Sequence, residues 1–567
     1  MQLARRLLKK GLLREEDIAR VEQAIEASAG KPPHEVMLEK GFVKEPDLMQ
    51  ALAEEFGLEL VDLTDRNISE EVLQSIPAKV VHRRQLVPLA KEGTKLTVAT
   101  GNPYDLYSLD ELHTLTGYQI HPVLASMREI SRLIKSHFGV GGETLSALVR
   151  DRAEEQGDVE LLEGLETDDS EAAKMAQEAS VVKLVNEILI EAANEQASDI
   201  HIECEEGGLR IRYRIDGILQ TQNFPPEIGR FQAAIISRLK IMARLNIAEK
   251  RLPQDGRIKM RVQGREIDVR LSIIPMVHGE GMVMRLLDKG RMVFNLPSVG
   301  MLPDTYKIFK QIIDRPHGIV LVTGPTGSGK STTLYSALNE IKDESTKIIT
   351  VEDPVEYQQS GISQIQTHAK IGLTFAAALR SILRHDPDVI LIGEMRDVET
   401  SESAIQASLT GHLVFSTLHT NDAPSAFTRL IEMGIEPFLV SSTVEGVLAQ
   451  RLVRKICQEC VVEYEPEVKD VPPDFPGFGG NIILKKGAGC RSCRQTGYRG
   501  RLGLFELLVA SDPIRDMIVA RENAMRIREV ALREGMITLR KDGWRKVLAG
   551  MTTVDEVNRV TAGDVVH

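Results

Sequence analysis

The sequence predicts a chain of several α/β domains, one of which has a P-loop fold. Its 567 residues are enough for roughly three to five domains. A glycine-rich stretch at 324–331 fits the phosphate-binding pattern G-x-x-x-x-G-K-[ST], and it stands between an apolar strand pattern and a helix pattern. Four of the five cysteines form two C-x-x-C pairs later in the chain, which indicates a metal site in a reducing compartment.

The composition is ordinary for a soluble globular protein, with 42% hydrophobic and 27% charged residues. A net charge of −12 argues against wholesale nucleic-acid binding, so no nucleic-acid partner is expected. No apolar run approaches the roughly 20 residues that cross a bilayer. Charged residues interrupt the N-terminal apolar stretch before it reaches the length of a signal-peptide core. We therefore expect a cytoplasmic protein.

The N-terminal region predicts two modules. Residues 1–60 contain a degenerate helical repeat, in which Lys10-Gly11-Leu12-Leu13 corresponds to Lys40-Gly41-Phe42-Val43. Residues 61–138 predict an α/β module, with a hairpin that turns at Glu92-Gly93. Residues 139–176 are acidic and lack aromatic residues between 154 and 171, which predicts a flexible linker.

Residues 177–290 predict a second α/β domain that is rich in arginine. Arg210, Arg212 and Arg214 alternate with apolar residues and therefore share one face of a strand. That face is either ordinary solvated surface or a cation row that an anion or acidic neighbours must compensate, since like charges side by side repel. Two later strand patterns carry Arg270 and Arg285.

Residues 291–567 predict the P-loop domain. Backbone N–H groups of the loop and the N-terminus of the following helix would surround phosphate oxygens. Lys330 would reach the β and γ phosphates, and the Ser331 hydroxyl would hold Mg²⁺. This predicts a nucleoside triphosphate site, whose binding residues are Gly324, Pro325, Thr326, Gly327, Ser328, Gly329, Lys330, Ser331 and Thr332.

Acidic residues follow the next two apolar strand patterns. Glu352 and Glu356 belong to the stretch after 347–351, and Glu394 follows 388–392. Ligands of an open α/β sheet bind beyond the carboxyl ends of its strands, so these acids should lie beside the phosphates. There they would hold Mg²⁺ through water and orient the attacking water. Glu394 is our first choice for the activating carboxylate, with Glu352 as the rival.

Two histidines flank a further predicted strand at 413–418. His419 follows its carboxyl end and should point toward the phosphates, where a neutral imidazole can bind the γ-phosphate or sense hydrolysis. His412 precedes the strand and is a second candidate nucleotide contact, with a structural role as the alternative.

The cysteine pairs Cys457/Cys460 and Cys490/Cys493 have the spacing that lets four thiolates meet one tetrahedral ion. Four thiolates leave no open position, which predicts a structural zinc within an insert at 455–495. The remaining Cys204 is expected to pack in a core.

These motifs resemble those of the secretion ATPase family. The stretches 324–333, 350–356, 388–394 and 410–421 are similar to its Walker A, Asp box, Walker B and His box. The run 251–257 and the paired cysteines resemble the GspE/PilB branch, which powers type IV pilus assembly and type II secretion. The resemblance implies a RecA-like P-loop core, a PAS-like α/β N2 domain and a homohexameric ring that binds ATP, Mg²⁺ and Zn²⁺.

The resemblance also implies arginine fingers and a partner. Arginines of 177–290 would act in trans on the phosphates, with Arg212 favoured by motif position over Arg210, Arg214, Arg270 and Arg285. Work would pass to an inner-membrane platform protein that drives pilus extension, and membrane association would be peripheral through that partner. Alternatives are a type II secretion motor, a DNA-uptake motor and a nucleotide-gated scaffold without turnover.

The repeat at 1–60 resembles a helical c-di-GMP-binding domain. The arginine positions of that motif hold Gln2 and Pro32, and its glycine positions hold Ala4 and His34. Without the arginines, the bidentate contacts to phosphate and guanine are lost. We therefore expect the fold without c-di-GMP binding.

Overall fold

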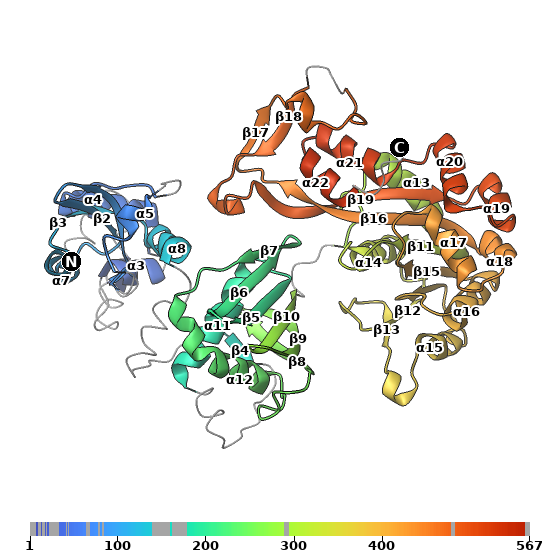
Figure 1. The fold of residues 1–567 in the computed structure, drawn as a ribbon, viewed down its shortest axis with the longest axis horizontal. Coiled ribbons are helices and arrows are strands. Elements are labelled where there is room, and N and C mark those ends of the chain that lie inside the picture. The colour runs from blue at the N-terminus through green and yellow to red at the C-terminus, as the bar shows by residue number, and fades with distance from the viewer. Residues whose placement is uncertain are drawn as a thin grey trace. The chain divides into compact units, whose positions relative to one another are not determined.

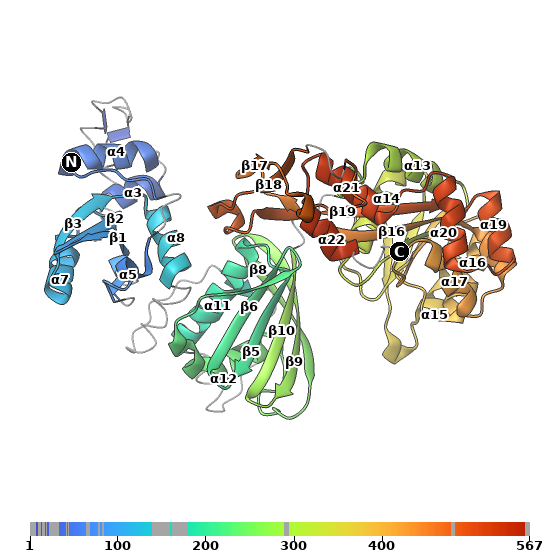
Figure 2. The ribbon, with the colours of Figure 1, turned by 45° about the horizontal axis from the view of Figure 1, so that its top comes forward.

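The computed structural model of the chain describes residues 33–138 with short gaps, isolated positions before residue 33, and residues 159–161, 178–288, 294–477 and 482–561. The chain divides into two compact units, Met1–Gly290 and Arg291–His567. Figure 1 shows their elements, and Figure 2 shows the same ribbon turned by 45°. No helix in the described part of the chain is long and apolar enough to span a bilayer.

The N-terminal helices pack against the α/β module that follows them. In α4 (Glu45–Phe56), apolar residues at helical spacing, such as Leu48 and Leu52, are buried. They share a core with Leu124, which ends β3 (Gln119–Leu124). The predicted helical repeat and α/β module therefore have common packing, although the first repeat falls largely outside the described residues.

The α/β module is a three-stranded sheet with strand order β1-β2-β3. The predicted hairpin forms between β1 (Leu86–Glu92) and β2 (Lys95–Thr100), and Gly93 turns it with a φ of 60°. The remaining helices of this region are α3 (Pro33–Glu39), α5 (Glu70–Leu73), α7 (Leu106–Thr116) and α8 (Met127–Phe138).

Part of the predicted linker forms a strand. The three residues of β4 (Val159–Leu161) pair antiparallel with residues 260–262 at an edge of the next sheet. The rest of the linker lies outside the described residues.

The arginine-rich domain is a seven-stranded antiparallel sheet in the order β4-β8-β9-β10-β5-β6-β7. Helices α11 (Ala179–Asn194) and α12 (Gln232–Met242) cover one face and share its apolar core (Figure 2). The strands are β5 (Asp199–Glu205), β6 (Gly208–Ile215), β7 (Ile218–Thr221), β8 (Gln254–Val262), β9 (Arg265–Met276) and β10 (Gly279–Asp288). Because successive side chains of a strand point to opposite faces of the sheet, the polar residues that alternate with core residues face away from the helices.

The second unit is built on a sheet in the order β13-β12-β14-β15-β11-β16-β19. All neighbours are parallel except β16 and β19. The central strands are buried throughout, as in a sheet covered on both faces, and their alternate residues enter two separate cores. The strands are β11 (Gly318–Thr323), β12 (Ile348–Glu352), β13 (Ser363–Gln366), β14 (Val389–Ile392), β15 (Leu413–Leu418), β16 (Val444–Ile456) and β19 (Tyr498–Val509).

Helices cover both faces of this sheet. One core contains residues of α13 (Pro303–Ile313) and α14 (Lys330–Ile341), and the other contains residues of α15 to α20. The latter are α15 (Phe375–Ile382), α16 (Val398–Leu409), α17 (Pro424–Glu432), α18 (Pro437–Thr443), α19 (Asp512–Val519) and α20 (Ala524–Arg533). The predicted α/β P-loop architecture is confirmed.

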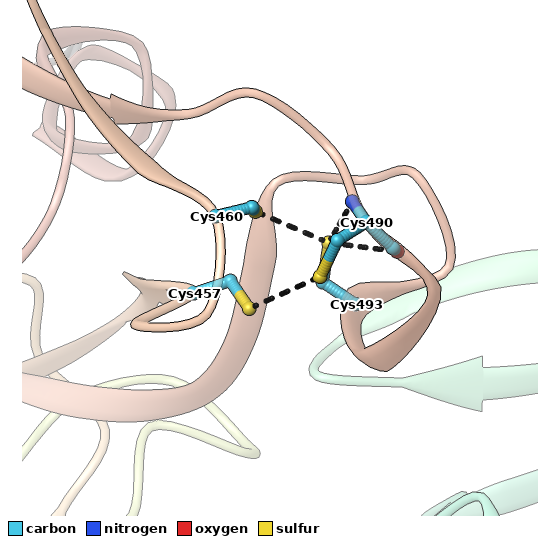
Figure 3. Close-up of side chains that lie close together, drawn as sticks. All are labelled: Cys457, Cys460, Cys490 and Cys493. Atoms are coloured by element: carbon cyan, nitrogen blue, oxygen red, sulfur yellow. Dashed lines mark hydrogen bonds between the residues drawn. The ribbon is translucent and has the colours of Figure 1, made fainter. Parts of the chain in front are cut away.

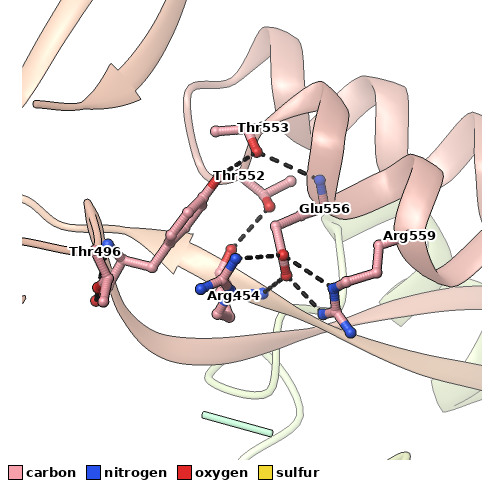
Figure 4. A network of polar contacts seen from close by, with 7 residues as sticks. Arg454, Thr496, Thr552, Thr553, Glu556 and Arg559 are labelled. Atoms are coloured by element: carbon pink, nitrogen blue, oxygen red, sulfur yellow. Dashed lines mark hydrogen bonds and ion pairs between the residues drawn. The ribbon is translucent and has the colours of Figure 1, made fainter. Parts of the chain in front are cut away.

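The cysteine-bearing insert leaves the sheet at the end of β16. It contains the two-stranded sheet of β17 (Val461–Tyr464) and β18 (Leu484–Gly487), and the chain returns through β19. Phe475 in the insert packs on Trp544 of α21 (Leu539–Leu548), and Asp474 accepts hydrogen bonds from Arg540 and Trp544. The helix α22 (Val554–Thr561) then binds the end of β16 through Glu556, which pairs with Arg454 and Arg559 (Figure 4).

Candidate nucleotide site

The phosphate loop follows the buried strand β11 and leads directly into α14. Close packing requires two of its glycines, Gly324 and Gly329. A Cβ on Gly324 would lie 2.6 Å from the carbonyl oxygen of Gln450, and one on Gly329 would lie 2.9 Å from Gln450 Nε2. Both glycines have positive φ, at 147° and 90°. The loop is therefore shaped against β16, with its backbone N–H groups at the N-terminus of α14.

Lys330 begins α14 and lies over the loop. Its Nζ donates hydrogen bonds to the carbonyl oxygens of Gly324 (2.8 Å) and Pro325 (3.1 Å). Burial lowers the pKa of Lys330 to about 8, and the nearby cation Arg451 adds to this shift while Glu394 opposes it. Lys330, Glu394 and Arg451 therefore lie in one electrostatic environment.

Glu394 follows β14 and is the acid that faces this lysine. Its side chain is 13% exposed, with Oε2 at 2.6 Å from Arg396 Nε and 3.4 Å from His419 Nε2. His419 is the residue after the carboxyl end of β15. Because β15 is parallel to β11, this end lies at the same edge of the sheet as the phosphate loop. The structure thus brings Glu394 and His419 together beside the phosphate loop.

Glu352 has a different environment. It ends β12 almost fully buried and accepts hydrogen bonds from Thr350 Oγ1 (2.6 Å), Gln364 Nε2 (3.1 Å) and the hydroxyl of Tyr335. Burial, with the adjacent carboxylate, raises the pKa of Tyr335 well above its usual value. Glu352 thereby connects β12 and β13 to the loop helix. The backbone amide of Glu356 faces the same tyrosine hydroxyl.

His412 lies at the opposite end of β15 from the phosphate loop. Its Nδ1 is 2.8 Å from the carbonyl oxygen of Ala407 and 3.1 Å from Thr410 Oγ1. Because Gly318 pairs with Leu413 and Thr323 with Leu418, the whole strand, about 17–20 Å, separates His412 from the loop. Within this unit the structure places His412 away from the site where we expected it, because parallel strands present only their carboxyl ends to the nucleotide.

In the other unit, the predicted arginines face acidic neighbours. Arg210 pairs with Glu205 (2.8 Å) and Arg212 with Glu203 (2.5 Å). Acidic neighbours therefore compensate the positive charge of Arg210 and Arg212. Arg214 Nε lies 3.6 Å from Asp199, a buried carboxylate.

A row of directly paired residues crosses five strands of the same sheet. In the order β8, β9, β10, β5 and β6, its members are Arg257, Arg270, Arg285, Asp199 and Arg214. Four of them, all but Arg214, line a cavity of about 670 Å³ together with Asp255. Paired positions lie about 5 Å apart, and Asp199 pairs with the two arginines on its neighbouring strands, Arg285 and Arg214. This surface favours an anion.

Several of these residues were missed by sequence reasoning. Arg257 and Asp199 join the row only through strand register, which the sequence does not reveal. Arg451 belongs to β16 and donates to the backbone oxygen of Asn421 at 2.9 Å, which places it at the segment that follows His419. It reaches the site because β16 pairs with the strand that leads into the phosphate loop, and no signal in the sequence alone indicated this.

The four insert cysteines converge as predicted (Figure 3). Their sulfurs all lie within 4.8 Å of one another, with Cys457–Cys490 and Cys460–Cys493 at 3.8 Å. A tetrahedral Zn²⁺ with bonds of about 2.3 Å needs sulfurs about 3.8 Å apart. Burial raises the pKa of Cys460 to about 12. At Cys493 the opposing backbone N–H groups of Cys490 and Gly497 prevail and lower the pKa to about 7. The donor set fits zinc.

Comparison with known proteins identifies the family. The model described as "Type II/IV secretion system protein" matches residues 174–559. The chain belongs to this secretion ATPase family. It is an ATP hydrolase of the PilB/GspE type, as the resemblance of its motifs predicted. A second model, the MshEN domain, matches residues 56–144, which correspond to the α/β module rather than to the helical repeat at 1–60.

Individual relatives of this secretion ATPase carry two kinds of name. It is 43% identical to the type IV pilus assembly ATPase PilB of Myxococcus xanthus over 93% of each chain. It is equally 43% identical to type II secretion system protein E of Xanthomonas campestris, over 98% of this chain and 97% of the relative. Among solved structures it resembles the pilus retraction motor PilT with bound ADP, at 26% identity over 66% of this chain and 96% of that one, with a TM-score of 0.43.

Proposed function

We propose that this secretion ATPase drives type IV pilus extension by hydrolysing ATP in a homohexameric ring. One observation carries the hydrolytic part of the proposal: Glu394 lies beside both Lys330 and His419, at the carboxyl ends of parallel strands. A carboxylate there can accept the proton of a water that attacks the γ-phosphate in line.

The roles within one protomer follow from the geometry. Residues 324–332 hold the phosphates, Lys330 exchanges its loop carbonyls for phosphate oxygens, and Ser331 would hold Mg²⁺, which neutralises charge on the phosphates. Glu394 is the activating base, and His419 reports the γ-phosphate to the rest of the domain. Glu352 positions the loop helix through Tyr335, and we assign it no proton transfer.

The arginines complete the site from a neighbouring protomer. The row of Arg257, Arg270 and Arg285 is the strongest candidate, because all three arginines line one cavity and directly paired positions place them side by side. Arg212, which motif position favours, and Arg210 follow because each already has a glutamate partner, and Arg214 follows because it does not line the cavity. Domain closure in the ring would bring the row to the γ-phosphate.

The mechanical work of this motion would pass from the ring to a partner protein. An inner-membrane platform protein would convert domain rotation into the lifting of pilin subunits, and the ATPase would remain at the cytoplasmic face of the membrane through that contact. Structural zinc would stiffen the cysteine insert against α21 and α22.

A deletion strain tests the assignment. Complementation with the wild-type gene should restore surface pili, and complementation with Lys330→Ala should not. Type II secretion is the second candidate, favoured by the relative matched over 98% of this chain. Normal pili together with an enzyme retained inside the cell would support secretion and overturn the pilus proposal.

A further inference from the structure

The segment that carries His419 is held at several points by buried groups. We define the His419 strap as residues 419–423, between β15 and α17. Its Thr420 N–H donates to Thr323 Oγ1 (2.9 Å), the last residue before the phosphate loop. Asn421 accepts from Arg451 at its backbone oxygen and at Oδ1. The strap is thus connected both to the loop and to β16.

A third contact comes from Glu506 in the middle of β19. This carboxylate is fully buried, with 0% of the residue exposed. Its Oε1 accepts the N–H of Ala423 at 2.9 Å, and its Oε2 accepts the N–H of Leu539 at 3.3 Å. These two donors lie at the end of the strap and at the first residue of α21.

The sheet register brings Glu506 to the level of the nucleotide site. Leu418, Thr323, Ala449 and Glu506 are directly paired across β15, β11, β16 and β19. One row of the sheet therefore contains the residue before His419, the residue before the phosphate loop and the buried carboxylate. Placing a charge in such a core is costly, and structures retain it where its hydrogen bonds determine a geometry.

We propose that Glu506 is a positioning residue for ATP hydrolysis, which fixes the His419 strap by accepting the N–H of Ala423 while it anchors the same sheet row to α21. This inference rests on the role proposed above for His419. Both oxygens of Glu506 face N–H donors, so only a carboxylate satisfies both. A glutamine would turn its own N–H₂ toward one of them and leave a buried donor without an acceptor.

The test is a double-mutant cycle in the full-length ATPase. We would measure kcat by phosphate release and the affinity for a fluorescent ATP analogue for E506Q, H419A and the double variant. E506Q should lower kcat tenfold or more with nucleotide affinity within twofold of wild type. If Glu506 acts through the strap, the double variant should be no slower than H419A alone, within twofold.

Glu445 provides the matched control. It is also a buried carboxylate on a strand of this sheet, but it lies at the start of β16, before the stretch that contacts the loop and the strap, and binds Arg315 and Arg515. E445Q should lower the melting temperature, and its effect on kcat should multiply with that of H419A. Hydrogen exchange at 413–423 should accelerate in E506Q and not in E445Q.

Two results would overturn the inference in distinguishable ways. If the effects of E506Q and H419A on kcat multiply, Glu506 does not act through the His419 strap, and the proposed function remains intact. A normal kcat for H419A would instead remove the role of His419, and this inference with it. If E506Q does not fold, E506D serves in the same cycle, because it retains the charge but is too short to reach both N–H groups.

Discussion

Arg285 and Asp199 lie directly opposite each other on β10 and β5, with Arg285 Nε 3.2 Å from Asp199 Oδ1. The same carboxylate lies 3.6 Å from Arg214 Nε. One buried acid is therefore the counter-ion for cations on both of its neighbouring strands. Any change in its charge must alter how much the arginine row repels itself.

Asp199→Asn should therefore destabilise the arginine-rich domain and increase its response to anions. We expect a loss of about 1 kcal/mol in the free energy of unfolding, since the arginines are partly exposed and solvent screens their repulsion. Inorganic triphosphate should raise the melting temperature of the variant more than that of wild type. Glu205→Gln, at the exposed pair with Arg210, should change neither the free energy of unfolding nor the response to triphosphate. An equal response of the two variants would contradict the role of Asp199 as counter-ion of the arginine row.

Arg285→Ala should lower ATP turnover strongly while nucleotide affinity is retained. A cation that completes the site in trans contributes on the order of 10³-fold to phosphoryl transfer. Steady-state phosphate release and equilibrium binding of a fluorescent ATP analogue measure the two quantities separately. Arg261→Ala, at the exposed pair with Glu266, is the matched control, with turnover expected within threefold of wild type. A similar loss in both variants would indicate a general effect of surface charge.

The two candidate carboxylates should respond differently to amide substitution. Glu394→Gln removes the base beside His419, so kcat should fall at least about 10²-fold with ATP still bound. Glu352→Gln disturbs the hydrogen bonds to Thr350, Gln364 and Tyr335, so its main effect should be a lower melting temperature. The reverse pattern would make Glu352 the activating acid.

Removal of the metal should destabilise the cysteine insert more than the P-loop core. We expect about one zinc per chain by elemental analysis and its loss in Cys457→Ser, because four thiolates are needed for a closed tetrahedral site. Hydrogen exchange should then accelerate at 458–477 and in α21, which the insert contacts through Asp474. Cys204→Ser is the control, since that thiol is buried elsewhere, and it should retain the metal. Full zinc content in Cys457→Ser would contradict the site.

The N-terminal helices should lose stability in mild acid because of His34. This residue is 2% exposed, stacks on Tyr104, and burial lowers its pKa to about 4. The unfolded chain binds a proton near pH 6.5 and the folded one does not, so stability is present above pH 6.5 and is lost as the pH falls toward 4. At pH 5 the loss is about 2 kcal/mol.

Hydrogen exchange of 33–56, corrected for intrinsic rates, measures this loss. His34→Phe should keep the ring contact and abolish the pH dependence, whereas His121→Phe, at an exposed position, should retain it. Identical pH profiles for wild type and His34→Phe would show that another group titrates.

Local patterns predicted the chemistry of this chain, and distant pairings decided its geometry. The phosphate loop, the strand-end acids and the cysteine pairs are each contained in a short stretch, so spacing alone revealed them. The sequence could not choose between Glu394 and Glu352, because Tyr335 and Gln364 approach Glu352 only in the folded sheet. It likewise could not show that Arg257, Arg270 and Arg285 fall in one row, since their strands pair in a register that no motif encodes.

Strand β16 gives the metal insert and the nucleotide loop a common mechanical element. It extends for 13 residues, with Gln450 against the loop, Arg451 on the strap, Arg454 on α22 and Cys457 immediately beyond its end. Hydrogen bonds to β11 hold its first half as far as Ala449, and hydrogen bonds to β19 hold it from Gly446 to Ile456, which limits bending between the loop and the insert. A push on the insert should therefore shift the loop as one end of a stiff bar shifts the other, and force can travel along it in either direction.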